Sequence, residues 1–202
     1  MKRLVFFLVA SVLGAALIIG GGMAIAIATR PKPVTASVLT PPAPAADFTL
    51  RDVNGQSVSL ASLRGKPVLM TFGYTFCPDV CPITLVKLAQ AKKLLGKGGQ
   101  DLQVVFVTVD PDRDTADVIK RYLAQYDPAF IGLVPTPTEL ADLAKTYNVV
   151  YEKQPGSEAS GYTMAHTAAT LVIDGQGRVR MLFWPDMTPD EMASDLRTVV
   201  GV

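Results

Sequence analysis

The chain has 202 residues, of which 49% are hydrophobic and 18% charged, and this composition excludes both an intrinsically disordered and a fibrous protein. Residues 1–46 hold four of the 19 Lys and Arg and none of the 18 Asp and Glu, so residues 47–202 carry 15 basic against 18 acidic side chains, a net charge of −3. Such a domain is not expected to bind nucleic acid, because that affinity comes from basic side chains that neutralise phosphates. Two Cys and one His also exclude multi-disulfide scaffolds and zinc fingers with four Cys and His ligands.

The chain begins with a long uncharged segment. Residues 4–28 contain no charged side chain and as a helix would be ~37 Å long, against ~30 Å for the hydrocarbon core of a bilayer. Lys2 and Arg3 precede the segment and Arg30 and Lys32 follow it, a slight bias that favours the amino end in the cytoplasm. Residues 1–30 are therefore predicted to include one transmembrane helix that anchors a domain outside the membrane.

A cleaved signal peptide is the alternative interpretation of this segment. Residues 26–28 read Ala-Ile-Ala, which resembles a small-residue cleavage site, but the apolar run greatly exceeds the usual hydrophobic region of ~7–15 residues. The segment also lacks the Arg- and Ser-rich amphipathic character of an organelle transit peptide. We therefore expect an uncleaved single-pass anchor in a bacterial inner membrane, with the C-terminal domain in the periplasm.

A proline-rich segment follows the predicted anchor. Residues 31–46 contain five prolines among Ala, Val and Thr, and such a sequence cannot sustain a ladder of helical hydrogen bonds. It is predicted to be a semi-extended linker of ~3 Å per residue that holds the domain away from the membrane. The remaining residues, 47–202, are enough for one domain with one core.

Residues 47–202 alternate between strand and helix patterns, which predicts an α/β sandwich with a central mixed sheet. Asn54-Gly55 marks a hairpin turn because both residues tolerate positive φ, and Thr188 with Glu191 marks the capped start of the last helix. In chain order the predicted elements are a hairpin (47–51 and 56–60), a buried strand (67–73), a helix (82–95), a buried strand (102–109), helices (115–125 and 137–147), a short strand (149–152), an irregular loop (152–163), a hairpin (168–173 and 179–184) and a helix (189–200).

The two cysteines stand in a C-x3-C pattern between a predicted strand and a predicted helix. Pro82 directly follows Cys81, and proline is favoured in the first helical turn, so Cys81 is expected at a helix N-terminus, where free amides stabilise a thiolate. Residues four apart in a helical turn have Cβ atoms ~5–6 Å apart. That separation suits either a shared metal ion or a disulfide between Cys77 and Cys81, and the spacing does not separate the two. Two buried thiols that only pack are the third interpretation.

The single histidine, His166, lies just before a predicted strand, and the default interpretation of a lone His is a surface or core residue. If it meets the cysteines, the set becomes two thiolates and one imidazole. Soft thiolates favour Cu(I), zinc or iron-sulfur clusters, and imidazole also suits Cu(II), so this mixed set can hold copper in both oxidation states. Zinc prefers a fourth donor, whereas a three-ligand copper site leaves a position open for an acceptor thiolate.

These residues resemble the Sco/SenC copper-binding proteins, which act in assembling the dinuclear copper site of cytochrome c oxidase subunit II. The family's T-x-C-P-D-x-C-P stretch stands here at residues 75–82, its D-P-x-R-D-T segment at 110–115, and its histidine before a strand at His166. The resemblance covers residues 47–200 and the anchor. It implies a thioredoxin-like fold for 47–202, copper bound by Cys77, Cys81 and His166, an upstream periplasmic copper donor, and oxidase subunit II as the acceptor.

Other functions are possible on a thioredoxin-like fold. A C-x-x-C oxidoreductase does not fit three intervening residues, and a peroxiredoxin motif would place Pro and Thr where Met70 and Tyr74 stand. A reductase that keeps the copper-site cysteines of the oxidase reduced, through a redox-active disulfide between Cys77 and Cys81, is the main alternative. A redox or copper sensor is a third hypothesis. For the copper chaperone itself, no turnover of a small substrate is expected.

Residues around the C-x3-C motif are assigned supporting roles. Tyr74 and Phe76 are expected to shield the site, and Asp79 either accepts hydrogen bonds from loop amides or tunes the thiolates from outside the ligand set. The segment 110–115 lies between a strand and a helix, where Asp and Thr cap free amides, and contact with a partner is the alternative. Trp184 is predicted to be a core residue.

Overall fold

A computed structural model describes residues 33–156 and 161–202. The predicted membrane anchor, residues 1–30, lies outside the described residues. Among the residues that are described, no helix combines the length and the hydropathy needed to cross a bilayer. The chain divides into two units, Met1–Pro33 and Val34–Val202, and the second contains all the elements below.

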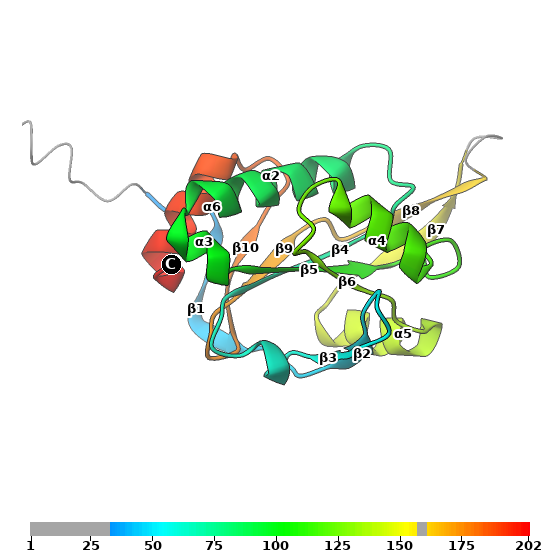
Figure 1. Cartoon of the computed structure of the whole chain (residues 1–202), viewed down its shortest axis with the longest axis horizontal. Helices are drawn as coiled ribbons and strands as arrows, with labels where there is room; N and C mark the ends of the chain where they lie inside the picture. The colour runs from blue at the N-terminus through cyan, green and yellow to red at the C-terminus, as the bar shows by residue number, and fades with distance from the viewer. Residues whose placement is uncertain (1–32, 157–160) are drawn as a thin grey trace, which may run out of the picture. The chain divides into compact units, whose positions relative to one another are not determined.

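The second unit is built on a six-stranded mixed sheet with the strand order β1-β10-β9-β4-β5-β6 (Figure 1). β4 runs parallel to β5, which runs parallel to β6, whereas β9 is antiparallel to both of its neighbours and β1 is antiparallel to β10. The predicted α/β class with a central mixed sheet is therefore confirmed. The strands of the sheet are β1 (Ser37–Pro44), β4 (Val68–Gly73), β5 (Gln103–Thr108), β6 (Ile131–Leu133), β9 (Thr170–Ile173) and β10 (Arg178–Phe183).

Helices cover both faces of the sheet, with α2, α4 and α6 on one face and α5 together with the β2–β3 hairpin on the other (Figure 1). The side chains of β4 alternate between the two cores, so Met70 and Phe72 pack on the α5 side and Leu69 packs on the α2 side. The other elements are β2 (Thr49–Arg51), β3 (Ser57–Ser59), a 3₁₀ turn (Ala61–Leu63), α2 (Val80–Leu94), α3 (Lys97–Asp101), α4 (Ala116–Ala124), α5 (Pro137–Thr146) and α6 (Pro189–Asp195), which continues as a π-helical segment (Leu196–Val200).

The proline-rich segment is not a linker throughout its predicted range of 31–46. Residues Ser37–Pro44 form β1, which pairs antiparallel with β10 at the edge of the sheet. An edge strand bonds on one side only, so proline is tolerated where its missing N–H faces away from the sheet. The pairing register shifts between Val38 and Ala43, within the proline-containing part of the strand. The linker prediction is wrong for these residues.

Both ends of the connection predicted to be irregular, residues 152–163, belong to a second small sheet. β7 (Tyr151–Pro155) pairs antiparallel with β8 (Tyr162–His166), so that Tyr151 lies opposite His166 and Pro155 opposite Tyr162. Neither strand has a fully buried face, and most of their residues are half-buried or exposed. The apolar alternation that reveals a strand in a sequence is therefore missing from both.

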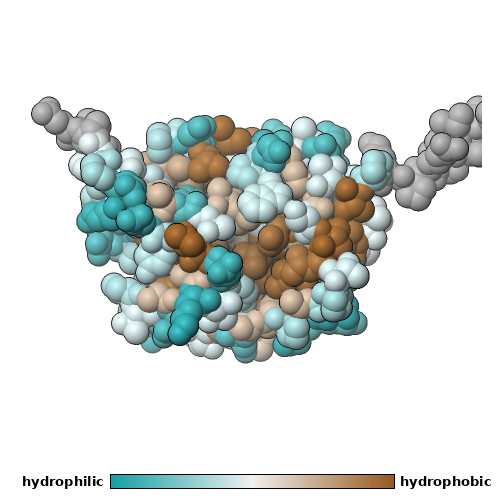
Figure 2. Space-filling view, turned by 180° about the vertical axis from the view of Figure 1, so that it is seen from behind, coloured by the Kyte–Doolittle hydropathy of each residue, from teal (hydrophilic) through white to brown (hydrophobic). Residues whose placement is uncertain are grey.

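The predicted core position of Trp184 is also wrong, because its side chain is 44% exposed and its indole N–H donates to Ser37 Oγ. Seen from behind, the molecule shows a hydrophobic area over β1 and β10 (Figure 2). A groove of about 400 Å³ opens on this face and is lined by Leu39, Leu182 and Trp184 among others. This end of the sheet thus presents apolar side chains that no helix within residues 33–156 or 161–202 covers.

The chain that leads into β1 is fastened to α6 by one buried carboxylate. Asp195 accepts hydrogen bonds from the backbone N–H groups of Thr35 (3.0 Å) and Ala36 (2.7 Å).

We expect Asp195→Ala to lower the free energy of unfolding by about 2 kcal/mol, because two amides lose their acceptor. Urea denaturation of the full chain in detergent measures the change. Asp190→Ala, at an exposed position of the same helix, is the control, and equal losses in both variants would contradict the anchoring role.

Candidate metal centre

The site lies at the carboxyl ends of two neighbouring parallel strands. β4 ends at Gly73 and β5 at Thr108, and these two residues are paired in register. The Val109 N–H donates to the Gly73 carbonyl at 2.8 Å, which holds the two strand ends together. The loop that carries the cysteines follows β4, and the 110–115 loop follows β5, so both leave the same edge of the sheet. Loops at the carboxyl ends of parallel strands commonly form binding sites in α/β folds.

The cysteine loop places both sulfur atoms at the N-terminus of α2. Cys77 closes a turn by donating its backbone N–H to the Tyr74 carbonyl at 3.3 Å. Cys81 lies in the first turn of α2, as the sequence predicts, and its backbone N–H donates to Cys77 Sγ at 3.4 Å. Both cysteines are free, but Cys81 is buried, with 5% exposure, whereas Cys77 is half-buried.

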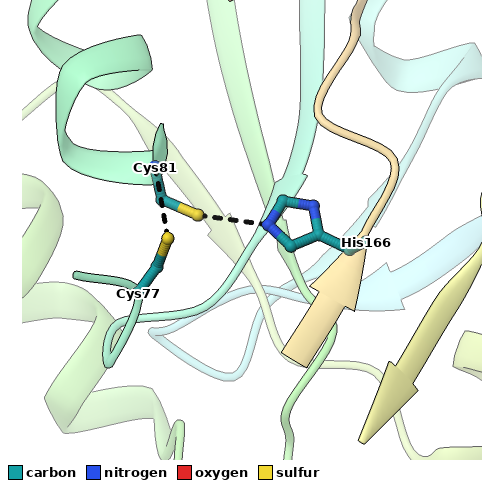
Figure 3. Close-up of side chains that lie close together, drawn as sticks. All are labelled: Cys77, Cys81 and His166. Carbon is teal, nitrogen blue, oxygen red and sulfur yellow. Dashed lines mark hydrogen bonds between the residues drawn. The ribbon is translucent and has the colours of Figure 1, made fainter. Parts of the chain in front are cut away.

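The hairpin β7–β8 brings the third side chain to this site. His166 is the last residue of β8, and its Nε2 lies 3.4 Å from Cys81 Sγ (Figure 3). On the other side of the ring, Nδ1 lies 3.0 Å from the Thr167 carbonyl oxygen. A carbonyl only accepts hydrogen bonds, so Nδ1 carries the hydrogen of the neutral ring and Nε2 keeps its lone pair toward the sulfurs. The structure therefore brings all three predicted ligand residues together, with their ligand atoms within 4.8 Å of one another.

The two sulfurs share their protons unequally. The hydrogen bond with the Cys81 side chain lowers the pKa of Cys77 to about 4, against the opposing effect of burial. The same sulfur–sulfur hydrogen bond, together with burial, raises the pKa of Cys81. The opposite directions of the two pKa shifts favour a thiolate at Cys77 and a thiol at Cys81.

A buried carboxylate ties the cysteine loop to the end of β5. Asp114 is fully buried and accepts hydrogen bonds from the Thr75 N–H at 3.0 Å, from the Thr75 hydroxyl, and from the Thr108 hydroxyl at 2.6 Å. Burial raises the pKa of this carboxyl group, while the hydrogen bonds from Thr108 and Thr75 oppose that rise. The predicted capping role of the 110–115 segment is confirmed at Thr115, whose side chain accepts from the Val118 N–H at the start of α4.

Sequence reasoning missed two residues that support the sulfurs, Asp114 and Gly73. A Cβ atom at Gly73 would lie 3.0 Å from Cys81 Sγ and 2.9 Å from the Phe106 ring, so a side chain there would push against the sulfur. A glycine as the last residue of a buried strand is the signal that indicates such a close approach. Asp114 carries no comparable local signal, because its partners, Thr75 and Thr108, are separate in the sequence.

The residues predicted to surround the ligands occupy different positions. Tyr74 is buried, and its ring meets the His166 ring edge-on at a centroid distance of 6.0 Å. The Phe76 side chain is 55% exposed beside the site. Asp79 is the N-cap residue of α2, but its side chain forms no capping hydrogen bond with the described residues.

The geometry and chemistry of the three side chains fit one metal ion. Donors that share an ion at ~2.0–2.3 Å lie at most ~4.6 Å apart, so the observed spread needs an adjustment of a few tenths of an ångström. Two sulfurs and one imidazole nitrogen form a soft set that copper accepts in both common oxidation states. The half-buried position of Cys77 leaves one side of the set accessible to a further ligand.

Comparisons with known proteins agree with this geometry. A family model described as SCO1/SenC matches residues 38–201. An SCO2-like protein of Rickettsia conorii is 36% identical over 152 residues, which cover 75% of this chain and 74% of that protein. The structure of Bradyrhizobium japonicum ScoI with copper bound is 40% identical, has a TM-score of 0.70, and is matched over 78% of this chain and 99% of its own. The apo Sco1 protein from Thermus thermophilus is 38% identical, with a TM-score of 0.73 over 81% of this chain and 95% of its own.

These similarities agree with the resemblance drawn from the motifs at 75–82 and 110–115 and from His166. The matched region runs from β1 to the end of the chain, so it includes the whole sheet and both halves of the site. The likeness to the Sco structures also confirms the predicted thioredoxin-like fold. The chain belongs to the SCO1/SenC family.

Proposed function

We propose that this protein is a membrane-tethered copper chaperone. It takes copper from an upstream periplasmic donor, carries it on Cys77, Cys81 and His166, and delivers it to the dinuclear copper site of cytochrome c oxidase subunit II. The observation that carries this proposal is the meeting of the three donor atoms within 4.8 Å, although His166 lies 85 residues after Cys81. The copper-bound Bradyrhizobium japonicum ScoI, which is 40% identical, supports the choice of metal.

The donor set suits a protein that holds copper and then releases it. Two thiolates and a neutral imidazole leave a single excess negative charge around Cu(I) and balance the charge of Cu(II), so neither state requires a large buried charge. With three protein ligands, an acceptor thiolate can bind the metal before the protein ligands leave. The exposure of the Cys77 side of the site supports this exchange.

The uncharged segment at residues 4–28 supports the tether. It is long enough to span a bilayer, and the positive charges before it favour a cytoplasmic amino end. The domain would then act from the periplasmic side of an inner membrane, where the copper site of oxidase subunit II is assembled. In the described part of the chain, residues 33–36 lead into the edge strand β1.

Copper titration tests the three-ligand site. The full chain, reduced and in detergent, should bind one equivalent of copper with thiolate-to-copper absorption, and His166→Ala should weaken Cu(II) binding by more than about 100-fold. The reason is that loss of groups that only support a ligand already costs about 10–100-fold in metal affinity. His166 is the only histidine of the chain, so imidazole hyperfine coupling in the Cu(II) resonance spectrum reports on this residue alone.

Thr163→Ala, on the same strand as His166, is the matched control and should bind copper as the parent chain does. If His166→Ala binds both oxidation states as tightly as the parent chain, the three-ligand site is wrong. Loss of binding in Thr163→Ala as well would assign the effect to the hairpin rather than to the imidazole.

A thiol-disulfide reductase is the second candidate, and the unequal protonation of the two sulfurs favours it. A thiolate at Cys77 can attack a partner disulfide and form a mixed disulfide, releasing one partner thiolate. Cys81 then loses its proton and attacks Cys77 Sγ, which releases the second partner sulfur as a thiol. The partner gains two electrons, and the protein is left with a Cys77–Cys81 disulfide.

The pH dependence of alkylation tests this assignment of the thiolate. Because the pKa of Cys77 is lowered to about 4, its reaction with limiting iodoacetamide should be nearly independent of pH between pH 5.5 and 8 in the reduced, metal-free chain. Cys81 should stay largely unmodified over this range because its pKa is raised. Peptide mass spectrometry measures both rates. A Cys77 rate that rises about tenfold per pH unit across this range would show an ordinary thiol and contradict the assignment.

Oxidase assembly separates the two candidate functions. The variants are expressed in a strain that lacks the chromosomal copy of the gene. The chaperone function predicts that His166→Ala and Cys77→Ser both lower the copper content of the oxidase several-fold. The reductase predicts that His166→Ala supports normal assembly while Cys77→Ser fails. Immunoblots of each variant show whether equal amounts of protein are present.

A further inference from the structure

Arg113 lies where the two halves of the metal centre meet. It belongs to the loop after β5, and its Nε forms an ion pair with Asp110 of the same loop. The Asp110 side chain is only 3% exposed, which makes it a fixed partner for the guanidinium group. The described ion pair is therefore shielded from water and contributes more than an exposed pair of the same kind.

The guanidinium group of Arg113 contacts the hairpin that carries His166. It lies over the Tyr162 ring at 3.5 Å from the ring centroid, and its Nη1 donates to the Tyr162 carbonyl at 3.0 Å. The Tyr162 hydroxyl donates in turn to Asp110 Oδ1 at 2.8 Å. Tyr162 and His166 are the first and last residues of β8, and residues four apart in a strand point to the same side. The contacts at Tyr162 therefore act on the same side of the strand that presents His166.

The same guanidinium group contacts the cysteine loop. Its central carbon lies 4.7 Å from the centroid of the Phe76 ring and 5.8 Å from that of the Tyr74 ring. Phe76 directly precedes Cys77, and Tyr74 packs edge-on against the His166 ring. Cation–π contacts of this kind gain strength when they are removed from water. One cation thus bridges the segment before the first cysteine and the strand that ends at the histidine.

We propose that Arg113 is a positioning residue of the metal centre: it holds the β7–β8 hairpin against the cysteine loop and so keeps His166 within bonding reach of the sulfurs. This role gives the Asp110–Arg113 pair of the 110–115 segment a task beyond capping α4. It is needed because β7 and β8 pair only with each other and not with the six-stranded sheet. Side-chain contacts, together with the short connections at residues 147–150 and 167–169, then set the position of the hairpin in place of main-chain pairing to the sheet.

The inference rests on the proposed function only for its copper readout, since the hairpin can also be followed without metal. In the metal-free full chain in detergent, Arg113→Leu should raise the hydrogen exchange rates of the amides in 151–154 and 162–166 by about tenfold, while β4 and β5 stay protected. Arg113→Lys keeps the charge near Asp110 and Tyr162 and should restore part of the protection. Arg121→Leu, at an exposed position of α4, is the matched control and should change nothing.

A double-mutant cycle with Cu(I) separates positioning from general stability. Arg113→Leu should raise the dissociation constant for Cu(I), measured by competition with a chelator, by about tenfold, because the competent arrangement becomes less populated. In the His166→Ala background the same substitution should change the constant less than about twofold, because no imidazole is left to position.

Equal weakening with and without His166, or unchanged exchange in the hairpin of Arg113→Leu, overturns the proposal. If Arg113→Leu does not fold, Tyr162→Leu removes the contact from the side of the hairpin and must give the same two results. If His166→Ala binds copper as tightly as the parent chain, the proposed function fails, and hydrogen exchange in the metal-free chain still decides whether Arg113 holds the hairpin.

Discussion

The parallel pairing of β4 with β5 is the constraint on which the rest of the site depends. It makes the two strands end side by side at Gly73 and Thr108, so the cysteine loop and the 110–115 loop start from neighbouring points. From there Asp114 can reach Thr75, and Arg113 can reach the rings of the cysteine loop. An antiparallel pair would send one of these loops to the opposite edge of the sheet, and the supporting contacts could not form.

The two halves of the centre are held in different ways. The cysteines are fixed by a helix start, a tight turn and the buried Asp114 network, all attached to the six-stranded sheet. The histidine is carried by a two-stranded hairpin that depends on side-chain contacts for its position. A rigid sulfur pair and a separately attached imidazole allow the number of protein ligands to change without disturbing the core. This division is consistent with a protein that must both retain and release a metal ion.

The sequence predicts those parts of the structure that leave a local pattern. The apolar runs of β4 and β5 and the Thr188–Glu191 capping box have such patterns, and so does the placement of Cys81 at a helix start. The sequence pattern does not predict β1, which contains prolines, or β8, whose residues are mostly half-buried, because both strands lack apolar alternation. The prediction that His166 meets the cysteines rests on the family resemblance, because nothing in the spacing of these residues indicates it. Asp114 and Arg113 act through partners far apart in the chain, and these contacts exist only once the sheet has formed.

The unequal burial of the two sulfurs imposes a direction on any exchange of ligands. Cys81 is buried in the core, whereas Cys77 is only half-buried and directly follows the exposed Phe76. Among the described residues, Cys77 and His166 are half-buried and Cys81 is buried, so in the proposed exchange an incoming sulfur would meet Cys81 last. The bond between copper and Cys81 would then be the last protein bond to break. In the proposed chaperone, copper would thus be handed over along a fixed path. A receiving protein would have to present its cysteines to one small area of this surface and in one orientation.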